Sequence, residues 1–258
     1  MPFSFRRLAC SAAVLGLVAS FPLHTAFAES FNEEQRKEIG EIVRDYLIKN
    51  PEVLQEVMVE LDKKQQEESS RAQSAALSES KDILYSSKHS SVVGNPEGNV
   101  TIVEFFDYNC GYCKRAVADL GELMKADPNL RVILKDLPVL GEDSVQASQV
   151  ALAVQRQLSG EKLFKYHYDL MHSTGRVGAQ QALAMAQSMG LDMERLRKDM
   201  KSDDIRAALQ ENYALGDKLG LSGTPAFVVG DTVVPGAVGK LPLQQMVANT
   251  RKCGKASC

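Results

Sequence analysis

The sequence predicts an α/β fold with a long helical insertion, preceded by a separate helical segment. A β-α-β pattern runs from Val100 to Leu137, and a β-β-α pattern runs from Ala226 to Arg251. Between them, from about Ser144 to Gly220, the apolar residues recur almost throughout at helical spacing. Two strand-containing halves therefore enclose an inserted helical region, for which we expect bounds of about 141–220.

The first 28 residues have the pattern of a secretory signal peptide. Arg6 and Arg7 are positively charged, Leu8 to Phe21 is an apolar run, and Thr25 to Ala28 supplies the small residues that a signal peptidase reads. We expect cleavage near Ala28 and export to the periplasm. An uncleaved membrane anchor is the alternative, and the shortness of the apolar run, interrupted at Pro22, argues against it.

Charge and cysteine content limit the function further. Cleavage removes two arginines from a chain of formal charge −3 and leaves −5, with no concentrated basic patch. Nucleic acid is therefore not an expected partner. Of the five cysteines, Cys10 lies in the leader, and an even set of Cys110, Cys113, Cys253 and Cys258 remains in the exported chain.

The segment 29–80 reads as two amphipathic helices followed by a polar linker. An apolar stripe at three-and-four spacing is interrupted at Asn50-Pro51, which has the pattern of an N-cap and a first helical residue, and then restarts. Lys63 to Ser80 lacks large apolar residues and reads as a solvated helix or mobile linker. The stripe has no partner within the segment, so either self-association or docking on the main domain would bury it. The stripe consists of Ile39, Ile42, Val43, Tyr46, Leu47, Val53, Leu54, Val57, Met58 and Leu61.

The main domain begins with strand, helix and strand. A short strand at Ser91 to Val93 precedes a turn and a strongly apolar strand from Val100 to Phe106, and Lys114 to Met124 has helical spacing before a second strand from Leu130 to Leu137. After four or five helices in the insertion, we expect strands at 226–229 and 232–234 and a helix at about 241–251. Cys110 therefore lies at the start of a helix.

Cys110 and Cys113 form a Cys-x-x-Cys pair in a position suited to thiol chemistry. Unpaired backbone N–H groups and the helix dipole stabilise a thiolate at a helix start. Cys113 follows one turn later on the same face, close enough to form a disulfide with Cys110 or to resolve a mixed one. Lys114 and Arg115 add positive charge nearby. We expect Cys110 to be the attacking cysteine.

Two further residues stand out near these elements. Glu104 interrupts a strand that is apolar on both faces, where a buried carboxylate is costly, and such a cost suggests a proton-transfer role toward Cys113. An edge-facing, solvated glutamate is the alternative. Pro225 follows Thr224 at the entry to the returning strand, and the sequence alone does not predict a cis bond there.

The motifs from Glu104 to Tyr108, Cys110 to Cys113, and Gly223 to Phe227, in this order around a helical insertion, resemble the DsbA family of the thioredoxin fold. The resemblance covers about residues 90–252. It implies that Cys110 is the nucleophile, Cys113 the resolving thiol, Glu104 the buried acid, and Pro225 a cis proline with Thr224 beside the active site. Gly111 and Tyr112 replace the Pro-His dipeptide of the family's type member, so the redox potential does not carry over.

The N-terminal helices resemble the stalk of ScsC-like proteins, and that resemblance implies a homotrimer that shuffles disulfides. The expected organisation is a signal peptide at 1–28, an oligomerisation stalk and linker at 29–80, a DsbA-like thioredoxin domain at 81–252, and a cysteine-containing tail at 253–258. The expected function is a periplasmic disulfide isomerase, with exported cysteine-containing proteins as substrates and a membrane redox partner to reset the cysteines. A monomeric DsbA-like oxidase is the alternative.

A different class of function is metal binding. Cys110 and Cys113 together with Cys253 and Cys258 would offer four thiolates to zinc or copper(I), although the tail pair lies in a polar segment beyond the last helix. A local disulfide between Cys253 and Cys258 is the favoured interpretation of the tail, and a second shuttle pair is the alternative. We expect neither a cofactor nor a resident metal, and we assign no role to His89, His167 or His172.

Overall fold

A computed structural model describes residues 31–258, so the expected signal peptide lies outside the described residues. The chain divides into two compact units after Glu60. The first contains α1 (Glu33–Lys49) and the beginning of α2 (Glu52–Glu79). Among the described residues, no helix combines the length and the apolar character needed to cross a membrane.

In the first unit, α1 begins at a capping box and leaves its apolar side chains exposed. Asn32 accepts a hydrogen bond from the Gln35 backbone, while the Gln35 side chain accepts one from the Asn32 backbone. The role expected for Asn50 is wrong: it is the C-cap of α1, and its side chain and its backbone N–H both donate to the Tyr46 carbonyl, at 2.8 and 2.9 Å. No residue of α1 is buried.

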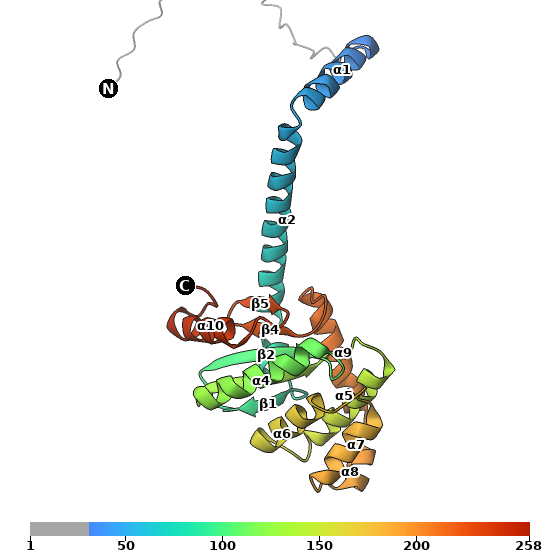
Figure 1. Ribbon diagram of the computed structural model, residues 1–258, viewed down its shortest axis with the longest axis vertical. Coiled ribbons are helices and arrows are strands. Elements are labelled where there is room, and N and C mark those ends of the chain that lie inside the picture. The colour runs from blue at the N-terminus through green and yellow to red at the C-terminus, as the bar shows by residue number, and fades with distance from the viewer. Residues whose placement is uncertain (1–30) are drawn as a thin grey trace, which may run out of the picture. The chain divides into compact units, whose positions relative to one another are not determined.

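The second unit is built on one five-stranded sheet in the order β1-β3-β2-β4-β5. Only β2 and β3 are parallel, as a β-α-β connection requires, and the other neighbours are antiparallel. Figure 1 shows α4 and α10 beside this sheet and the helices α5 to α8 lying together. The strands are β1 (Ser91–Gly94), β2 (Val100–Phe106), β3 (Leu130–Asp136), β4 (Ala226–Val229) and β5 (Thr232–Pro235).

The helices of this unit agree with the expected pattern, with five in the insertion. The connection α4 (Gly111–Ala126) starts earlier than expected because Cys110 itself caps it. A short helix, α3 (Lys81–Ser86), was not expected. The insertion comprises α5 (Glu142–Val154), α6 (Gly160–Met171), α7 (Ala179–Ser188), α8 (Met193–Asp199) and α9 (Asp203–Lys218), and α10 (Lys240–Cys253) ends the fold.

Two hydrophobic clusters cover the two faces of the sheet, and the alternation along β2 assigns its side chains to them. Ile102 and Phe106 belong to the cluster that includes α4, whereas Val103 and Phe105 belong to the opposite cluster with the end of α2, α3 and part of α9. Glu104 alternates with Val103 and Phe105, so it lies on the α4 side. The sheet therefore places this carboxyl on the side of Cys110 and Cys113.

The end of α2 is not a solvated linker. Ala76 and Leu77 are buried in the second cluster, Gln73 donates to the Leu219 carbonyl, and Glu79 pairs with Lys218 at 2.9 Å. The two apolar side chains in this otherwise polar sequence are enough to pack the last part of the helix against the face of the sheet.

Candidate active site

The thiol of Cys110 lies at the junction between the end of β2 and the start of α4. Cys110 is the N-cap of α4, and its Sγ accepts a hydrogen bond from the Cys113 backbone N–H at 3.3 Å. The same thiol donates to the carbonyl of Thr224 at 3.2 Å. Both Cys110 and Cys113 are free thiols and buried. The residues that the sequence singled out at positions 110, 113 and 224 therefore meet at one point.

The environment makes the two thiols different. A hydrogen bond from the Cys113 thiol, with further hydrogen bonds from the Thr224 side chain and from backbone N–H groups, outweighs burial and lowers the pKa of Cys110 to about 6. Burial and the bond to Cys110 raise the pKa of the Cys113 thiol well above its ordinary range. Cys110 is thus the thiol that ionises at neutral pH, and Cys113 stays protonated.

The positive side chains next to the cysteines have a different role from the expected one. Lys114 Nζ donates to the carbonyl of Ser173 at 3.2 Å, and the Arg115 guanidinium stacks over the ring of Tyr112 at 4.5 Å. Hydrogen bonds rather than these charges account for the lowered pKa of Cys110. Tyr112 itself is 61% exposed, so it presents an aromatic surface between the two cysteines.

Glu104 is fully buried, which excludes the solvated alternative. Its side chain is 0% exposed, and neither carboxyl oxygen has a hydrogen-bond partner in the structure. Burial, with a smaller contribution from the charge of Cys110, raises the pKa of Glu104 to about 8. The carboxyl of Glu104 in turn helps to raise the pKa of Cys113. Near neutral pH this group can hold or release a proton beside the thiols.

Pro225 completes the site from the other half of the fold. The Thr224-Pro225 peptide bond is cis, as the family resemblance implied, and Pro225 is buried. The Pro225 carbonyl accepts a hydrogen bond from Gly236 N–H at 2.8 Å, which ties this loop to the end of β5. The loop is thereby fixed where the Thr224 carbonyl meets Cys110.

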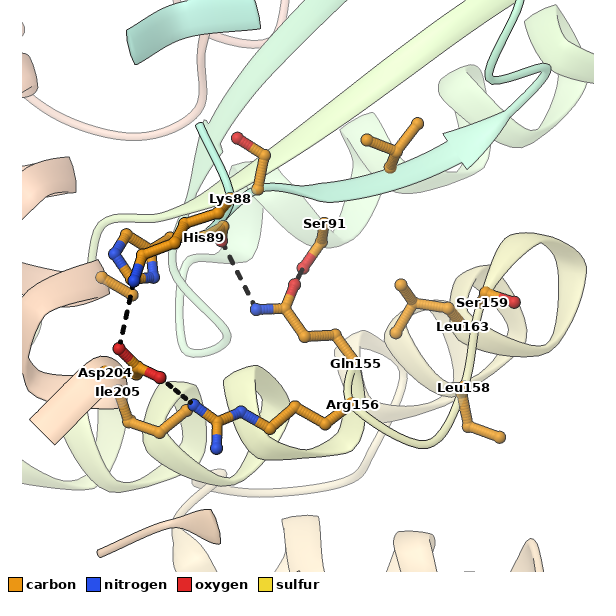
Figure 2. Close-up of a pocket in the computed structure, with 13 residues that line it drawn as sticks. Lys88, His89, Ser91, Gln155, Arg156, Leu158, Ser159, Leu163, Asp204 and Ile205 are labelled. Atoms are coloured by element: carbon orange, nitrogen blue, oxygen red, sulfur yellow. Dashed lines mark hydrogen bonds and ion pairs between the residues drawn. The ribbon is translucent and has the colours of Figure 1, made fainter. Parts of the chain in front are cut away.

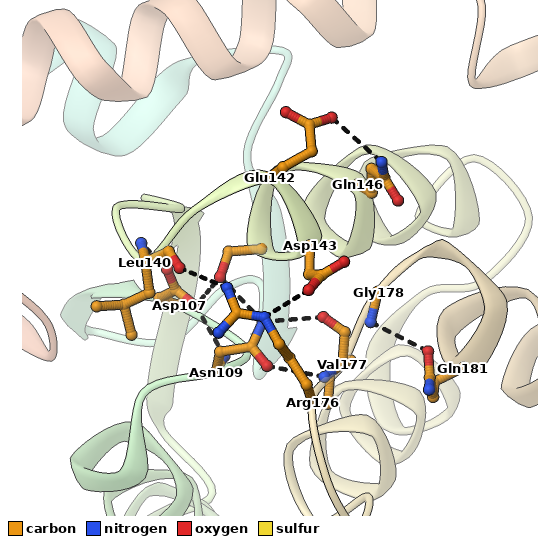
Figure 3. A network of polar contacts seen from close by, with 11 residues as sticks. Asp107, Asn109, Leu140, Glu142, Asp143, Gln146, Arg176, Val177, Gly178 and Gln181 are labelled. Atoms are coloured by element: carbon orange, nitrogen blue, oxygen red, sulfur yellow. Dashed lines mark hydrogen bonds and ion pairs between the residues drawn. The ribbon is translucent and has the colours of Figure 1, made fainter.

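Sequence reasoning missed the polar residues between the strand and the first cysteine. Asp107 is buried, and its carboxylate accepts hydrogen bonds from Asn109 N–H, Ser144 Oγ and Leu140 N–H at 2.7, 2.7 and 2.9 Å. Figure 3 shows this network reaching from the cysteine loop into the insertion. The sequence signal that could have revealed this network is the pair of polar residues, Asp107 and Asn109, just after the apolar strand.

Within residues 31–258, no histidine shares a hydrogen bond with Cys110 or Cys113. His167 is buried, contacts the rings of Phe106 and Tyr108, and shares a hydrogen bond of 3.2 Å between its Nδ1 and the Tyr108 hydroxyl. Burial lowers the pKa of His167 to about 3, so the ring is neutral at physiological pH. His172 stacks on Tyr168.

A cavity of about 420 Å³ beside β1 is a separate feature of the second unit (Figure 2). Its charged side chains pair with one another, because Asp204 contacts both Lys88 at 3.4 Å and Arg156 at 3.1 Å. His89 also lines it, whereas neither Cys110 nor Cys113 does. We therefore assign the cavity no part in the thiol chemistry.

The four-thiolate metal site is not formed. Cys253 and Cys258 are joined in a disulfide, as the favoured interpretation of the tail predicted, so their sulfurs are not available as thiolates. Within residues 31–258, no group of three or more histidine, cysteine or acidic side chains is arranged to hold a metal ion.

Family models match both units of the chain. The DSBA-like thioredoxin domain matches residues 101–247, and the copper resistance protein ScsC N-terminal domain matches residues 35–68. Among solved structures, a thioredoxin-like oxidoreductase from Silicibacter pomeroyi DSS-3 is 44% identical, with a TM-score of 0.63 over 67% of this chain and 98% of that one. ScsC from Proteus mirabilis in a transitional conformation is 33% identical, with a TM-score of 0.62 over 86% and 99%.

Curated relatives match over about half of this chain. The thiol:disulfide interchange protein DsbA of Bordetella pertussis is 24% identical over 135 residues, which are 52% of this chain and 64% of that protein. The Na(+)/H(+) antiporter NhaA 1 of Salinispora arenicola is 29% identical over 139 residues, which are 54% of this chain. The match spans only 21% of the antiporter's length.

Proposed function

Because the chain belongs to the family of DsbA-like thioredoxin domains, we propose that it catalyses thiol-disulfide exchange in exported proteins, as a disulfide isomerase of the periplasm. One observation carries this proposal: a free thiol with a pKa of about 6 caps α4 beside a buried thiol that stays protonated. Such a pair combines an attacking thiolate with a resolving thiol. The predicted signal peptide supports the compartment.

The proposed reaction begins when the Cys110 thiolate attacks one sulfur of a wrong disulfide in the substrate. A bond forms between Cys110 and that sulfur, and the second substrate sulfur leaves as a thiolate. In isomerisation, this thiolate attacks another substrate disulfide, and a thiol produced there later attacks the mixed disulfide and releases Cys110. No electrons are gained or lost overall.

Cys113 gives an exit from mixed disulfides that do not resolve. Its thiol loses a proton, for which the ionised form of Glu104 is the proposed acceptor, and attacks the Cys110 sulfur. The substrate leaves with two thiols, and a disulfide between Cys110 and Cys113 forms. The proposed membrane redox partner then reduces this disulfide. The loop at Thr224 and Pro225 is the proposed contact for an extended substrate strand.

Self-association of the N-terminal helices is the second part of the proposal, and a trimer is the expected state. Support comes from large apolar side chains that α1 and the start of α2 expose: Ile42 is 68%, Val57 58% and Met58 64% exposed. Such a stripe favours burial against copies of itself. Several active sites in one assembly would act on one misfolded chain, which favours isomerisation over simple oxidation.

The experiment is the reactivation of scrambled ribonuclease by the reduced protein, compared with Cys110→Ser and Cys113→Ser. We expect no activity from Cys110→Ser. We expect Cys113→Ser to accumulate mixed disulfides that non-reducing gels detect, because the resolving thiol is missing. If the wild-type protein only oxidises reduced ribonuclease and leaves scrambled ribonuclease unchanged, the DsbA-like oxidase is the correct reading.

A further inference from the structure

The residue that precedes the nucleophile is held by the helical insertion. The Asn109 side-chain amide donates to the carbonyl of Val177 and to Ser144 Oγ, both at 2.9 Å, and its oxygen accepts from Val177 N–H at 2.7 Å. Asn109 thus pairs with both backbone groups of Val177, as a neighbouring strand would. Figure 3 shows Asn109 and Val177 facing each other, with Asp107 alongside.

The backbone around Asn109 is fixed as well. Its N–H donates to Asp107 Oδ1 at 2.7 Å, and the Cys110 N–H donates to the Asp107 carbonyl at 3.0 Å. Ser144 Oγ donates to the same carboxylate oxygen at 2.7 Å, so one hydroxyl bridges Asp107 and Asn109. Val177 is fully buried and gives this contact a rigid support.

A second contact reaches the same loop of the insertion from the other side of the cysteines. Lys114 Nζ donates to the carbonyl of Ser173, and both Ser173 and Val177 lie in the segment between α6 and α7. The segment 172–178 therefore braces the cysteine motif before Cys110 and after Cys113. Neither contact involves a cysteine sulfur, so this bracing is separate from the hydrogen bonds of the thiols.

We propose that Asn109 is a positioning residue for the thiol reaction, and that it acts by fastening the backbone of Cys110 to Val177 of the insertion. The inference rests on the proposed function, since it concerns the same nucleophile. The Cys110 thiolate is stabilised while its sulfur stays within reach of its hydrogen-bond donors, among them the Cys113 thiol and the Cys113 N–H at the start of α4. Without the Asn109 side chain, the segment between Phe106 and Gly111 keeps the contacts of Asp107 with Ser144 and Leu140 but loses its link to Val177, and the sulfur moves away from this donor part of the time.

The test measures thiolate formation of Cys110 in the reduced full chain, from its ultraviolet absorbance against pH, for wild type, Asn109→Ala, Ser144→Ala and Arg176→Gln. We expect Asn109→Ala to raise the pKa of Cys110 by about one unit, or about tenfold less thiolate at a pH below the pKa. Ser144→Ala, which removes one of the three side-chain contacts of Asn109 together with the Ser144 contact of Asp107, raises it by a smaller amount because both contacts to Val177 remain. The alkylation rate with iodoacetamide at pH 6 falls in the same order.

Arg176→Gln is the matched control because Arg176 lies on the same loop but binds the Leu140 carbonyl and the exposed carboxylate of Asp143, not the cysteine motif. We expect its thiol pKa to equal that of the wild type. Circular dichroism and thermal melting confirm that each variant is folded, and Ser144→Ala supplies the answer if Asn109→Ala does not fold.

The outcomes separate this inference from the proposed function. If the pKa of Cys110 is near 6 in the wild type and has the same value in Asn109→Ala and Ser144→Ala, the positioning role is refuted and the exchange activity stands. If wild-type Cys110 itself titrates near the ordinary value of about 8.5, the attacking thiol of the proposed function is refuted. An equal rise in Arg176→Gln would show that any damage to the loop suffices, and would also refute the specific role of Asn109.

Discussion

Replacing Glu104 by glutamine tests whether the buried carboxyl is protonated at neutral pH. The carboxyl is 0% exposed and without a hydrogen-bond partner, and burial with the charge of Cys110 raises its pKa from 4.5 to about 8. A rise of this size corresponds to about 5 kcal/mol of penalty on the ionised form in the folded protein. Glutamine has nearly the same shape and no charge at any pH.

The direction of the effect follows from proton binding. Below pH 4.5 the carboxyl is protonated in the folded and unfolded protein alike, and it does not affect stability. Between 4.5 and about 8 only the unfolded chain ionises, so the free energy of unfolding of the wild type falls as pH rises. The loss amounts to about 3 kcal/mol by pH 7 and about 5 kcal/mol above pH 8.

Glu104→Gln removes this pH dependence. The buried amide adds a cost of about 1–3 kcal/mol that is the same at every pH, so the slope rather than the absolute stability is diagnostic. We expect the free energy of unfolding of the variant, minus that of the wild type, to rise by about 3 kcal/mol between pH 4.5 and 7.

The assay is urea unfolding of the reduced protein, followed by circular dichroism, at several values between pH 4.5 and 9. A second pair on a Cys110→Ser background removes the thiolate, whose charge contributes to the raised pKa of Glu104. Parallel pH profiles for variant and wild type, within about 1 kcal/mol, would refute a raised pKa for Glu104 and with it the proton-transfer role.

Three further predictions follow from individual residues. The Cys110 thiol should reach half its maximal alkylation rate near pH 6, because a lowered pKa makes it thiolate above that pH, and a midpoint near 8.5 contradicts this. Joint replacement of Cys253 and Cys258 by serine should lower the free energy of unfolding by about 2 kcal/mol through loop entropy, and an unchanged urea midpoint contradicts this. Lys135→Met should cost about 3 kcal/mol in urea unfolding, because it deprives Glu211 of a fully buried partner at 3.2 Å, and a loss below about 0.5 kcal/mol contradicts this.

The parts of the fold that could be predicted are those where a local sequence pattern is compatible with only one structure. Continuous apolar runs gave the buried strands β2 and β4, and Cys110 could be placed at a helix start because the run ends just before it. The unfavourable burial of Glu104 could also be read from its strand, because both of its neighbours along the chain are apolar.

Other features depend on contacts between distant segments and could not be read from the sequence. Lys135 looks like a surface residue, but it is buried and donates to the Ile83 carbonyl at 3.0 Å, which holds the unexpected helix α3 on the sheet. Asn109 likewise forms a hydrogen bond with Val177, which lies 68 residues later in the chain. Local patterns carry no information about such pairings, because the partner is set by the packing of the insertion.

Self-association of the N-terminal helices is the property by which we propose to distinguish an isomerase from an oxidase. The end of α2 belongs to the second unit and packs in its core, so a fair truncation keeps Leu61–Cys258 and removes only the first unit. A full-length double variant, Ile42→Asp with Val57→Asp, places charges on the exposed apolar stripe, and Arg44→Asp places the same side chain outside the stripe.

The most direct measurement is light scattering of the full chain, the truncated chain and these variants, each paired with reactivation of scrambled ribonuclease. We predict that the full chain and Arg44→Asp are trimers that reshuffle disulfides. The truncated chain and the double variant should be monomers that only oxidise thiols. If the full chain is a monomer and oxidises thiols as well as the truncated form does, the proposed isomerase is wrong and the chain is a DsbA-like oxidase.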